Sequence, residues 1–308
     1  MPTHTFTLEP VPPFRLDLTA WILRRRPENE IDRWDGETYS RVLILDGLPT
    51  LLRLRQAGSP SKPKLEVSLE GPQVSPSYEP AAAAAVARIF GIYTDLSAFY
   101  TFAEGVPELK LWVKLFKGAK PTRYPKLFEA LTNAISCQQL SLTVGILLLN
   151  RLAHLHGSAF QTAGGLRYAF PQAQALRGAD PKELRAIGYS FPKARYILGL
   201  AELVSSGGID LDSIAMLDDQ QALEAICAVR GIGRWSGEYF LLRGLGRTHI
   251  FPGDDVGARN HLQRWMELPD KLDYAGVSHV FGDWNPFGGL IYFHLLLKGL
   301  MEAGNFQV

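Results

Sequence analysis

The stretch Val229-Arg-Gly-Ile-Gly-Arg-Trp235 decides the fold of this chain. Apolar residues recur at helical spacing on both sides of it, so the sequence predicts two helices joined by a tight turn. Gly231 and Gly233 can take positive φ and leave room for a close neighbour, and the second helix begins with free backbone N–H groups. Because such groups bind phosphate, the stretch indicates a phosphate-binding helix-hairpin-helix. The apolar positions are Leu223, Ile226 and Val229 before the turn and Trp235, Tyr239 and Leu242 after it.

Two other structures could use the same glycines. A dinucleotide-binding loop needs a strand before its first glycine and a third glycine at the G-x-G-x-x-G offset. Here a helical pattern precedes the glycines and Gly237 falls one place late, so the dinucleotide-binding alternative is disfavoured. An ordinary helical hairpin without a ligand remains open from the turn alone.

The composition is typical of a soluble globular protein with about two domains. The chain has 308 residues, of which 46% are hydrophobic, and no apolar run is long enough to span a membrane. Residues 1–15 lack the basic start and apolar stretch of an export signal, so we expect a cytoplasmic protein. The net charge of +1 excludes a protein that coats nucleic acid through bulk charge. Any contact with DNA must therefore be local.

Few residues have the spacing of a metal or cofactor site. Cys137 and Cys227 lie far apart in the chain, which argues against a disulfide framework and an iron–sulfur cluster. The histidines lack a partner at ligand spacing, and no Ser or Cys has a recognisable activating context. We therefore expect no metal site formed by side chains and no organic cofactor.

The chain divides into two compositional regimes. We expect a small α+β domain over residues 1–119 and an all-helical domain over 120–308, with the helix-hairpin-helix at about 219–244. The expected strands are 5–8, 39–45, 50–54 and 65–69, with a turn at Asp46-Gly47, and the expected helices of the first regime are 16–25 and 80–90. The expected helices of the second regime are 125–136, 140–154, 181–187, 192–206, 219–229, 234–244, 255–267 and 286–303.

Several stretches of the chain together carry a family resemblance. They are Ile135-Ser-Cys-Gln-Gln-Leu-Ser141, Ala186-Ile-Gly-Tyr189 with Lys193-Ala-Arg-Tyr196, the hairpin through Tyr239, Phe251-Pro-Gly-Asp-Asp255 and Trp284-Asn-Pro-Phe287. The chain resembles the helix-hairpin-helix DNA glycosylases, and within them the bacterial 3-methyladenine DNA glycosylase II type, over nearly its whole length. The resemblance implies a monofunctional enzyme that hydrolyses the N-glycosidic bond of alkylated bases in double-stranded DNA. We expect it to act in base excision repair as a monomer.

The resemblance assigns the catalytic position to Asp255. Positive charge develops on the sugar as the glycosidic bond breaks, and a nearby carboxylate stabilises that charge. From the residues alone, helix capping is the better-supported role for either carboxylate, since Asp254 and Asp255 follow Pro-Gly and precede a helical run. We assign the chemistry to Asp255 and the capping role to Asp254.

The resemblance also implies an aromatic base pocket. A cationic base such as 3-methyladenine leaves without a strong general acid, and an aromatic face over it contributes about 0.5 to 2 kcal/mol. The positions that match are Trp235, Tyr239, Phe287 and Trp284, although aromatic residues at helical spacing more often fill a core. Trp235 stands where strand-cleaving relatives carry a Schiff-base lysine, and tryptophan cannot form that bond.

The resemblance further implies residues that contact DNA. A flipped nucleotide leaves a gap that a wedge must fill, and Gln138, Gln139 and Leu140 lie where the wedge is expected. Gln139 stands in place of the family's usual leucine, so two capping or exposed glutamines remain an alternative. Arg230 replaces a proline of the family, and it either contacts phosphate or is a solvated surface arginine. The hairpin residues that can contact phosphate are Gly231, Ile232, Gly233 and Arg234. The family's hairpin carbonyls can also hold a structural monovalent cation.

Two other functions stay open. Residues 188–189 and 193–195 also resemble oxoguanine glycosylases, which remove an oxidised base. A helix-hairpin-helix can also serve as a non-catalytic DNA-binding module. Asp255 beside an aromatic set favours an enzyme over that module.

Overall fold

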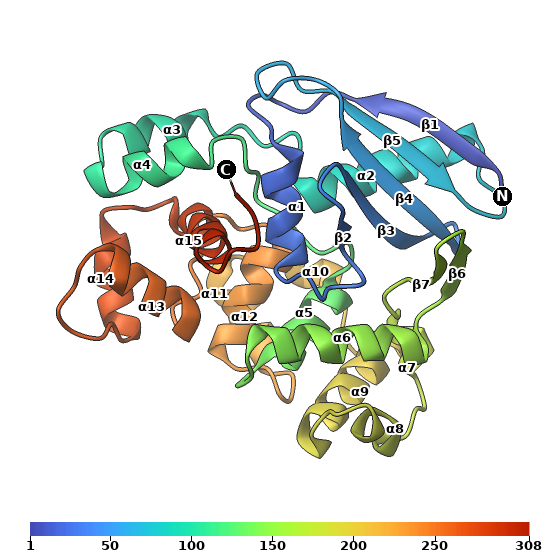
Figure 1. The fold of residues 1–308 in the computed structure, drawn as a ribbon. Helices are drawn as coiled ribbons and strands as arrows, with labels where there is room; N and C mark the ends of the chain where they lie inside the picture. The colour runs from blue at the N-terminus through green and yellow to red at the C-terminus, as the bar shows by residue number, and fades with distance from the viewer. Residues whose placement is uncertain (308) are drawn as a thin grey trace.

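A computed structural model describes residues 1–307 as an N-terminal sheet region joined to a larger helical part (Figure 1). The five-stranded sheet is antiparallel throughout, with the strand order β1-β5-β4-β3-β2. Asp46 and Gly47 both have positive φ and join β3 to β4, as the sequence predicted. The strands are β1 (Thr3–Leu8), β2 (Arg33–Trp34), β3 (Thr38–Leu45), β4 (Leu48–Gln56) and β5 (Leu65–Glu70).

Two helices cover one face of this sheet: α1 (Leu16–Arg24) and α2 (Glu79–Phe90), the latter preceded by a single 3-10 turn, η1 (Pro76–Tyr78). Every second residue of β5 is buried, because successive side chains of a strand point to opposite faces. Leu65, Val67 and Leu69 therefore pack against α1 and α2 in one apolar core. The predicted mixed α+β character of this region is confirmed.

The rest of the chain is mostly helical, as predicted, and α12 is extended by one π-helical turn, η2 (Leu241–Leu245). No helix within residues 1–307 is both long and apolar enough to cross a membrane. The helices are α3 (Ser97–Glu104), α4 (Pro107–Leu115), α5 (Leu127–Cys137), α6 (Leu142–His156), α7 (Ala173–Leu176), α8 (Pro181–Ala186), α9 (Phe191–Ser205), α10 (Leu211–Ala215), α11 (Asp219–Cys227), α12 (Arg234–Phe240), α13 (Val256–Trp265), α14 (Tyr274–Gly282) and α15 (Gly288–Glu302).

The helical part departs from the all-helical expectation at residues 159–168. Residues 159–168 form a hairpin of β6 (Ala159–Thr162) and β7 (Gly165–Tyr168), so this part is not entirely helical. Phe160 of the hairpin packs against Val42 and Leu51 on the second face of the large sheet. Its strands are too short for a period of two to stand out in the sequence. The sequence pattern also did not predict α3, α4, α7, α10 and α14, none of which exceeds nine residues.

Helix α1 joins the two regions, because its opposite sides are buried in different cores. One side packs on the sheet, while Leu18, Trp21 and Ile22 pack with Phe293 and Leu297 of α15. Helices α3 and α4 also pack on α15, in a separate apolar cluster. The boundary expected at residue 119 stays a prediction. What matters for the site is that the C-terminal end of α1 points into the helical part (Figure 1).

Candidate active site

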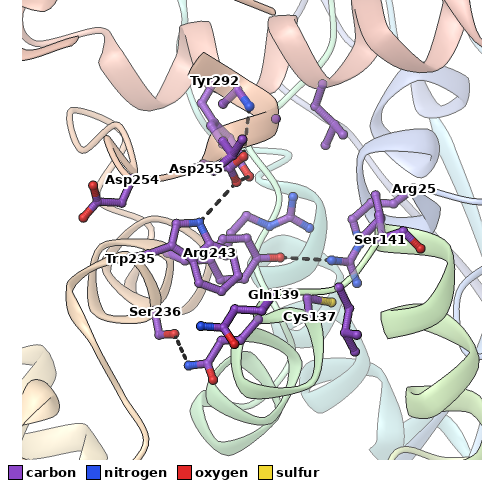
Figure 2. Close-up of a pocket in the computed structure, with 18 of the residues that line it drawn as sticks. Arg25, Cys137, Gln139, Ser141, Trp235, Ser236, Arg243, Asp254, Asp255 and Tyr292 are labelled. Atoms are coloured by element: carbon purple, nitrogen blue, oxygen red, sulfur yellow. Dashed lines mark hydrogen bonds between the residues drawn. The ribbon is translucent and has the colours of Figure 1, made fainter. Parts of the chain in front are cut away.

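A cavity of about 1120 Å³ lies between the end of α1, the α5–α6 turn, the start of α9, α12, α13 and α15. Trp235 and Tyr239 of α12 line it together with Asp255, as the sequence analysis expected. Figure 2 shows the side chains of Trp235, Asp255, Tyr292, Arg243 and Arg25 arranged around the same space. Segments far apart in the sequence thus converge on one chamber.

Asp255 is held at both of its carboxylate oxygens. Its Oδ1 accepts the backbone N–H of Ala258 at 2.9 Å, which makes Asp255 the N-cap of α13. Its Oδ2 accepts the Trp235 indole N–H at 3.3 Å and the Tyr292 hydroxyl at 2.9 Å (Figure 2). Burial raises the pKa of Tyr292 well above its usual value, and the Asp255 carboxylate raises it further, so Tyr292 remains a neutral donor.

The division of roles between the two carboxylates was predicted wrongly. Asp254 does not cap α13; its Oδ2 accepts from Nε of Arg234 at 2.7 Å in an exposed ion pair. Asp255 both caps α13 and lines the cavity. A single carboxylate can do both because each of its oxygens accepts separate hydrogen bonds.

The loop that carries Asp255 is anchored by Glu238 of α12. Glu238 Oε2 accepts the backbone N–H of Gly253 at 3.0 Å, and Oε1 accepts the Tyr274 hydroxyl of α14 at 2.6 Å. Burial raises the pKa of Glu238, and burial together with the Glu238 carboxylate raises the pKa of Tyr274 to about 12. The Arg234 guanidinium lies 3.7 Å from the centre of the Tyr274 ring. Neither Glu238 nor Tyr274 was predicted from the sequence, because no local motif marks them.

The hairpin between α11 and α12 has the predicted geometry. Gly231 has φ of 92°, and a Cβ atom there would lie 2.3 Å from the Tyr196 ring, so both conformation and packing require glycine. Gly233 is the N-cap of α12, and nothing lies within 4 Å of the position of its missing Cβ. Ile232 is buried beneath the turn and Arg230 is exposed. The start of α12 is therefore open to an approaching phosphate.

Two of the predicted pocket aromatics lie elsewhere. Trp284 packs against Trp265, with ring centres 5.9 Å apart, and Phe287 packs against Phe99 and Phe102. Neither Trp284 nor Phe287 lines the cavity. Helix α3, which the sequence analysis missed, supplies the apolar partners that keep Phe287 in a core. Tyr292 of α15 is an aromatic residue of the site that was missed.

The expected wedge residues lie at the α5–α6 turn and line the cavity. Gln138 is tied to the hairpin, since its Nε2 donates to the Gly231 carbonyl at 2.9 Å and to Ser236 Oγ at 2.8 Å. Gln139 has φ of 53°, in the left-handed region, and Leu140 is 42% exposed. Gln138 therefore joins α5 to the hairpin, while Gln139 and Leu140 remain free to meet a ligand.

The floor of the cavity contains arginines that the sequence analysis did not identify. Arg25 follows α1 and is buried; its Nη1 donates to the Tyr239 hydroxyl at 3.1 Å and its Nη2 to Asn133 Oδ1 at 2.6 Å. Arg243 of η2 is fully buried, and its Nη2 donates to the Ile22 carbonyl at 3.2 Å. No sequence motif marks either residue, because both reach the site only through the packing of α1 against the helical part.

Comparison with known proteins gives a consistent result. Residues 132–285 match the family model described as HhH-GPD superfamily base excision DNA repair protein. A Bacillus subtilis DNA-3-methyladenine glycosylase is 28% identical over 210 residues, which are 67% of this chain and 69% of that protein. Escherichia coli DNA-3-methyladenine glycosylase 2 is 28% identical over 168 residues, 54% of this chain and 56% of that protein.

Solved structures share the fold over almost the whole chain. A 3-methyladenine DNA-glycosylase from Archaeoglobus fulgidus superposes with a TM-score of 0.82 at 23% identity, over 95% of this chain and 98% of that one. A Clostridium acetobutylicum 8-oxoguanine glycosylase/lyase bound to DNA superposes with a TM-score of 0.77 at 16% identity, over 97% and 98%. At these identities the structural similarity establishes the fold but not the substrate, which must be argued from the residues of the cavity.

Proposed function

This chain belongs to the HhH-GPD superfamily of base excision DNA repair proteins, and we propose that it is a monofunctional DNA glycosylase that removes alkylated bases of the 3-methyladenine type. The observation that carries the proposal is the position of Asp255. Its Oδ2 faces a cavity beside the hairpin and is held there by Trp235 and Tyr292. A DNA-binding module without chemistry has no need of such a carboxylate.

The proposed reaction begins with breakage of the bond between the base and C1′ of the deoxyribose. The sugar becomes positively charged, and the Asp255 carboxylate stabilises that charge in a partly desolvated chamber. A water molecule then bonds to C1′ and gives up a proton to Asp255. Because the cap on Oδ1 and the two donors on Oδ2 fix the carboxylate before the substrate arrives, little reorganisation is needed during the reaction.

The base must leave the duplex to reach this cavity. We propose that the open start of α12 binds a DNA phosphate through its backbone N–H groups, with Arg230 nearby. Gln139 and Leu140 at the α5–α6 turn would fill the gap left by the flipped nucleotide. We keep the structural monovalent cation at the hairpin carbonyls as a proposal implied by the family resemblance alone. The Gly231 carbonyl already accepts a hydrogen bond from Gln138 Nε2.

Base release from methylated double-stranded DNA, followed by chromatography, tests the proposal directly. We expect 3-methyladenine to appear as a free base, with an abasic site left in an unbroken strand. An enzyme that nicks the strand without releasing a base, or that binds DNA and releases nothing, would overturn the proposal.

The absence of lyase activity is a separate prediction. Lys193 is the one lysine lining the cavity among residues 1–307, and its Nζ already donates to the carbonyls of Ser136 and Gln138. Burial lowers the pKa of Lys193 but does not free it to attack C1′. We therefore expect no borohydride-trapped adduct with DNA. A trapped adduct at stoichiometric yield that disappears in Lys193→Gln would contradict the monofunctional mechanism.

A further inference from the structure

The donor and the acceptor of each hydrogen bond around Tyr239 at the cavity floor are determined by the neighbouring bonds. Tyr124 OH donates to Asn133 Oδ1 at 2.9 Å and lies 2.8 Å from the Tyr239 hydroxyl. A phenol carries a single proton, so Tyr239 must be the donor in its bond to Tyr124. The Tyr239 oxygen also accepts from Arg25. Tyr239 thus has no proton left for a base, while Arg25 has more N–H groups than its two bonds use.

The arginines at this floor have no carboxylate within ion-pair distance, although the charge of Asp32 acts on Arg25 from farther away. Among the described residues no Asp or Glu forms an ion pair with Arg25 or Arg243, although both are buried. A guanidinium remains charged in proteins, so both cations persist. The cavity is lined by two carboxylates, of which Asp254 is already paired with Arg234. Asp255 is therefore the single unpaired carboxylate in a chamber that contains several cations.

The aromatic faces near the floor are also partly occupied. The Arg243 guanidinium carbon lies 5.2 Å from the centre of the Tyr124 ring and 5.9 Å from that of Tyr239. These are the distances at which a cation interacts with a ring. Trp235 remains for a base to stack on, and a positively charged base would share this cavity with two fixed positive charges. This arrangement differs from the wholly electron-rich pocket that the family resemblance implied.

Fixed positive charge has the opposite effect on an uncharged base. When the C1′–N bond of an uncharged nucleoside breaks, the electron pair stays on the base, which leaves as an anion. The oxygen of a water molecule bonds to C1′, and the proton that this water gives up to Asp255 finally neutralises the base anion. A charged N–H donor facing the departing base stabilises that anion without giving up its own proton.

We propose that Arg25, with Arg243 behind Tyr239, is the specificity-determining residue for uncharged damaged purines, whose departure as anions it stabilises. The proposal rests on the glycosylase function proposed above. It also means that the N-terminal region contributes a residue, Arg25, to the active site. Arg25 lies directly after α1, where φ of 59° and a backbone bond to Trp21 fix its position. Removal of this region would therefore remove the donor at the floor.

Single-turnover excision on two substrates tests the proposal. One duplex carries a single hypoxanthine, an uncharged base, and the other is methylated DNA that contains the cationic 3-methyladenine. We expect the unmodified enzyme to release both. Arg25→Gln should slow hypoxanthine release about 10- to 100-fold, since a charge-assisted hydrogen bond to the leaving base is lost. Release of 3-methyladenine should change much less or become faster.

Controls separate this role from a structural one. Arg25→Lys keeps the charge and should restore part of the hypoxanthine rate. Arg26→Gln removes a neighbouring cation whose Nη1 is bound to the Arg25 carbonyl, and it should change both substrates by the same factor. Equal losses on both substrates in Arg25→Gln would show that Arg25 only supports the fold and would overturn the proposal.

A measurement on the unmodified enzyme keeps the proposal testable if Arg25→Gln does not fold. A guanidinium does not titrate near neutrality, so the single-turnover rate of hypoxanthine release should not fall as the pH rises from about 6 to about 8. A protonated histidine or a buried carboxylic acid would lose its proton in that range, and the rate would then fall. A fall in this rate would show that a titrating acid assists the leaving base, and it would exclude Arg25 from that role. Release of 3-methyladenine without any hypoxanthine release would overturn this inference alone, whereas release of neither would overturn the glycosylase function itself.

Discussion

Two clusters of buried charge in this protein differ in the partners of their arginines. Between the sheet and α5, Arg41 donates from Nη1 to Asp32 at 2.8 Å and from Nη2 to Glu129 at 2.5 Å, and all three side chains are sealed from solvent. At the cavity floor, Arg25 and Arg243 have phenol, amide and carbonyl partners instead of carboxylates. In the sealed cluster the guanidinium is bound by carboxylates on both sides and reaches no ligand, whereas the arginines at the floor line a cavity and can act on one.

The clusters also differ in what surrounds them. Burial alone would raise the pKa of Asp32, but the Arg41 guanidinium and the hydrogen bonds from Tyr39 and Arg41 together hold the pKa below its usual value. Asp32 also accepts the Tyr39 hydroxyl at 2.6 Å. The sealed cluster thus joins the N-terminal sheet to the helical part, and we expect changes there to affect folding. Changes around the cavity should affect chemistry.

The largest expected effect is on Asp255. Asp255→Asn should lower base excision by about 10⁴-fold, or about 5 kcal/mol, because the charge that stabilises the transition state is lost. Asparagine is an equally good N-cap, so α13 and the stability of the fold should be little changed. Single-turnover excision and thermal unfolding measure the two effects. Asp254→Asn is the matched control, and an equal loss of activity in both variants would refute the assignment to Asp255.

The next effect belongs to the sealed cluster. Arg41→Leu leaves Asp32 and Glu129 buried without a counter-charge, so it should lower the free energy of unfolding by about 3 to 4 kcal/mol. Denaturant unfolding measures this loss. Adding Asp32→Asn and Glu129→Gln should recover part of it. If Arg41→Leu were as stable as the unmodified protein, the distinction between a structural and a functional charge cluster would fail.

A smaller effect concerns the hairpin. Gly233→Asp should weaken binding to all duplexes about 10-fold, since a carboxylate placed at the open start of α12 repels a phosphate. Gly233 has ordinary extended backbone angles and space for a side chain, so folding should be retained. Gly233→Asn, which caps the helix without charge, is the control. An affinity loss confined to damaged DNA would place this turn in the base pocket instead.

The smallest expected effect tests the anchor of the catalytic loop. Tyr274→Phe removes one hydrogen bond to Glu238 and should lower excision about 3- to 10-fold, with substrate affinity unchanged. Glu238 should still hold Gly253, so the loop shifts without being released. Separate measurement of the maximal single-turnover rate and of the DNA concentration that gives half of it distinguishes positioning from binding. A change in affinity alone would exclude a positioning role.

Local rules explain what the sequence predicted correctly. The resemblance to the helix-hairpin-helix DNA glycosylases is confirmed, as are the α+β region followed by a mostly helical part. The Asp46-Gly47 turn and the Gly231 hairpin follow from backbone conformations that few residues adopt, and helical periodicity places the hairpin between α11 and α12. Asp255 lies close to the hairpin in the chain, so a short-range motif could mark it.

Only the tertiary structure decided which side chains face the cavity. Trp284 and Phe287 have the spacing of pocket residues, but Trp284 is buried against α13 and Phe287 is half-buried against α3. An aromatic ring is also stable in a core, and the sequence does not specify which neighbour it packs against. Arg25 and Tyr239 are 214 residues apart and meet because α1 packs against α15 as well as the sheet. Sequence patterns determine local conformation, but contacts between distant segments depend on how whole faces pack, and the charge of this pocket comes from such contacts.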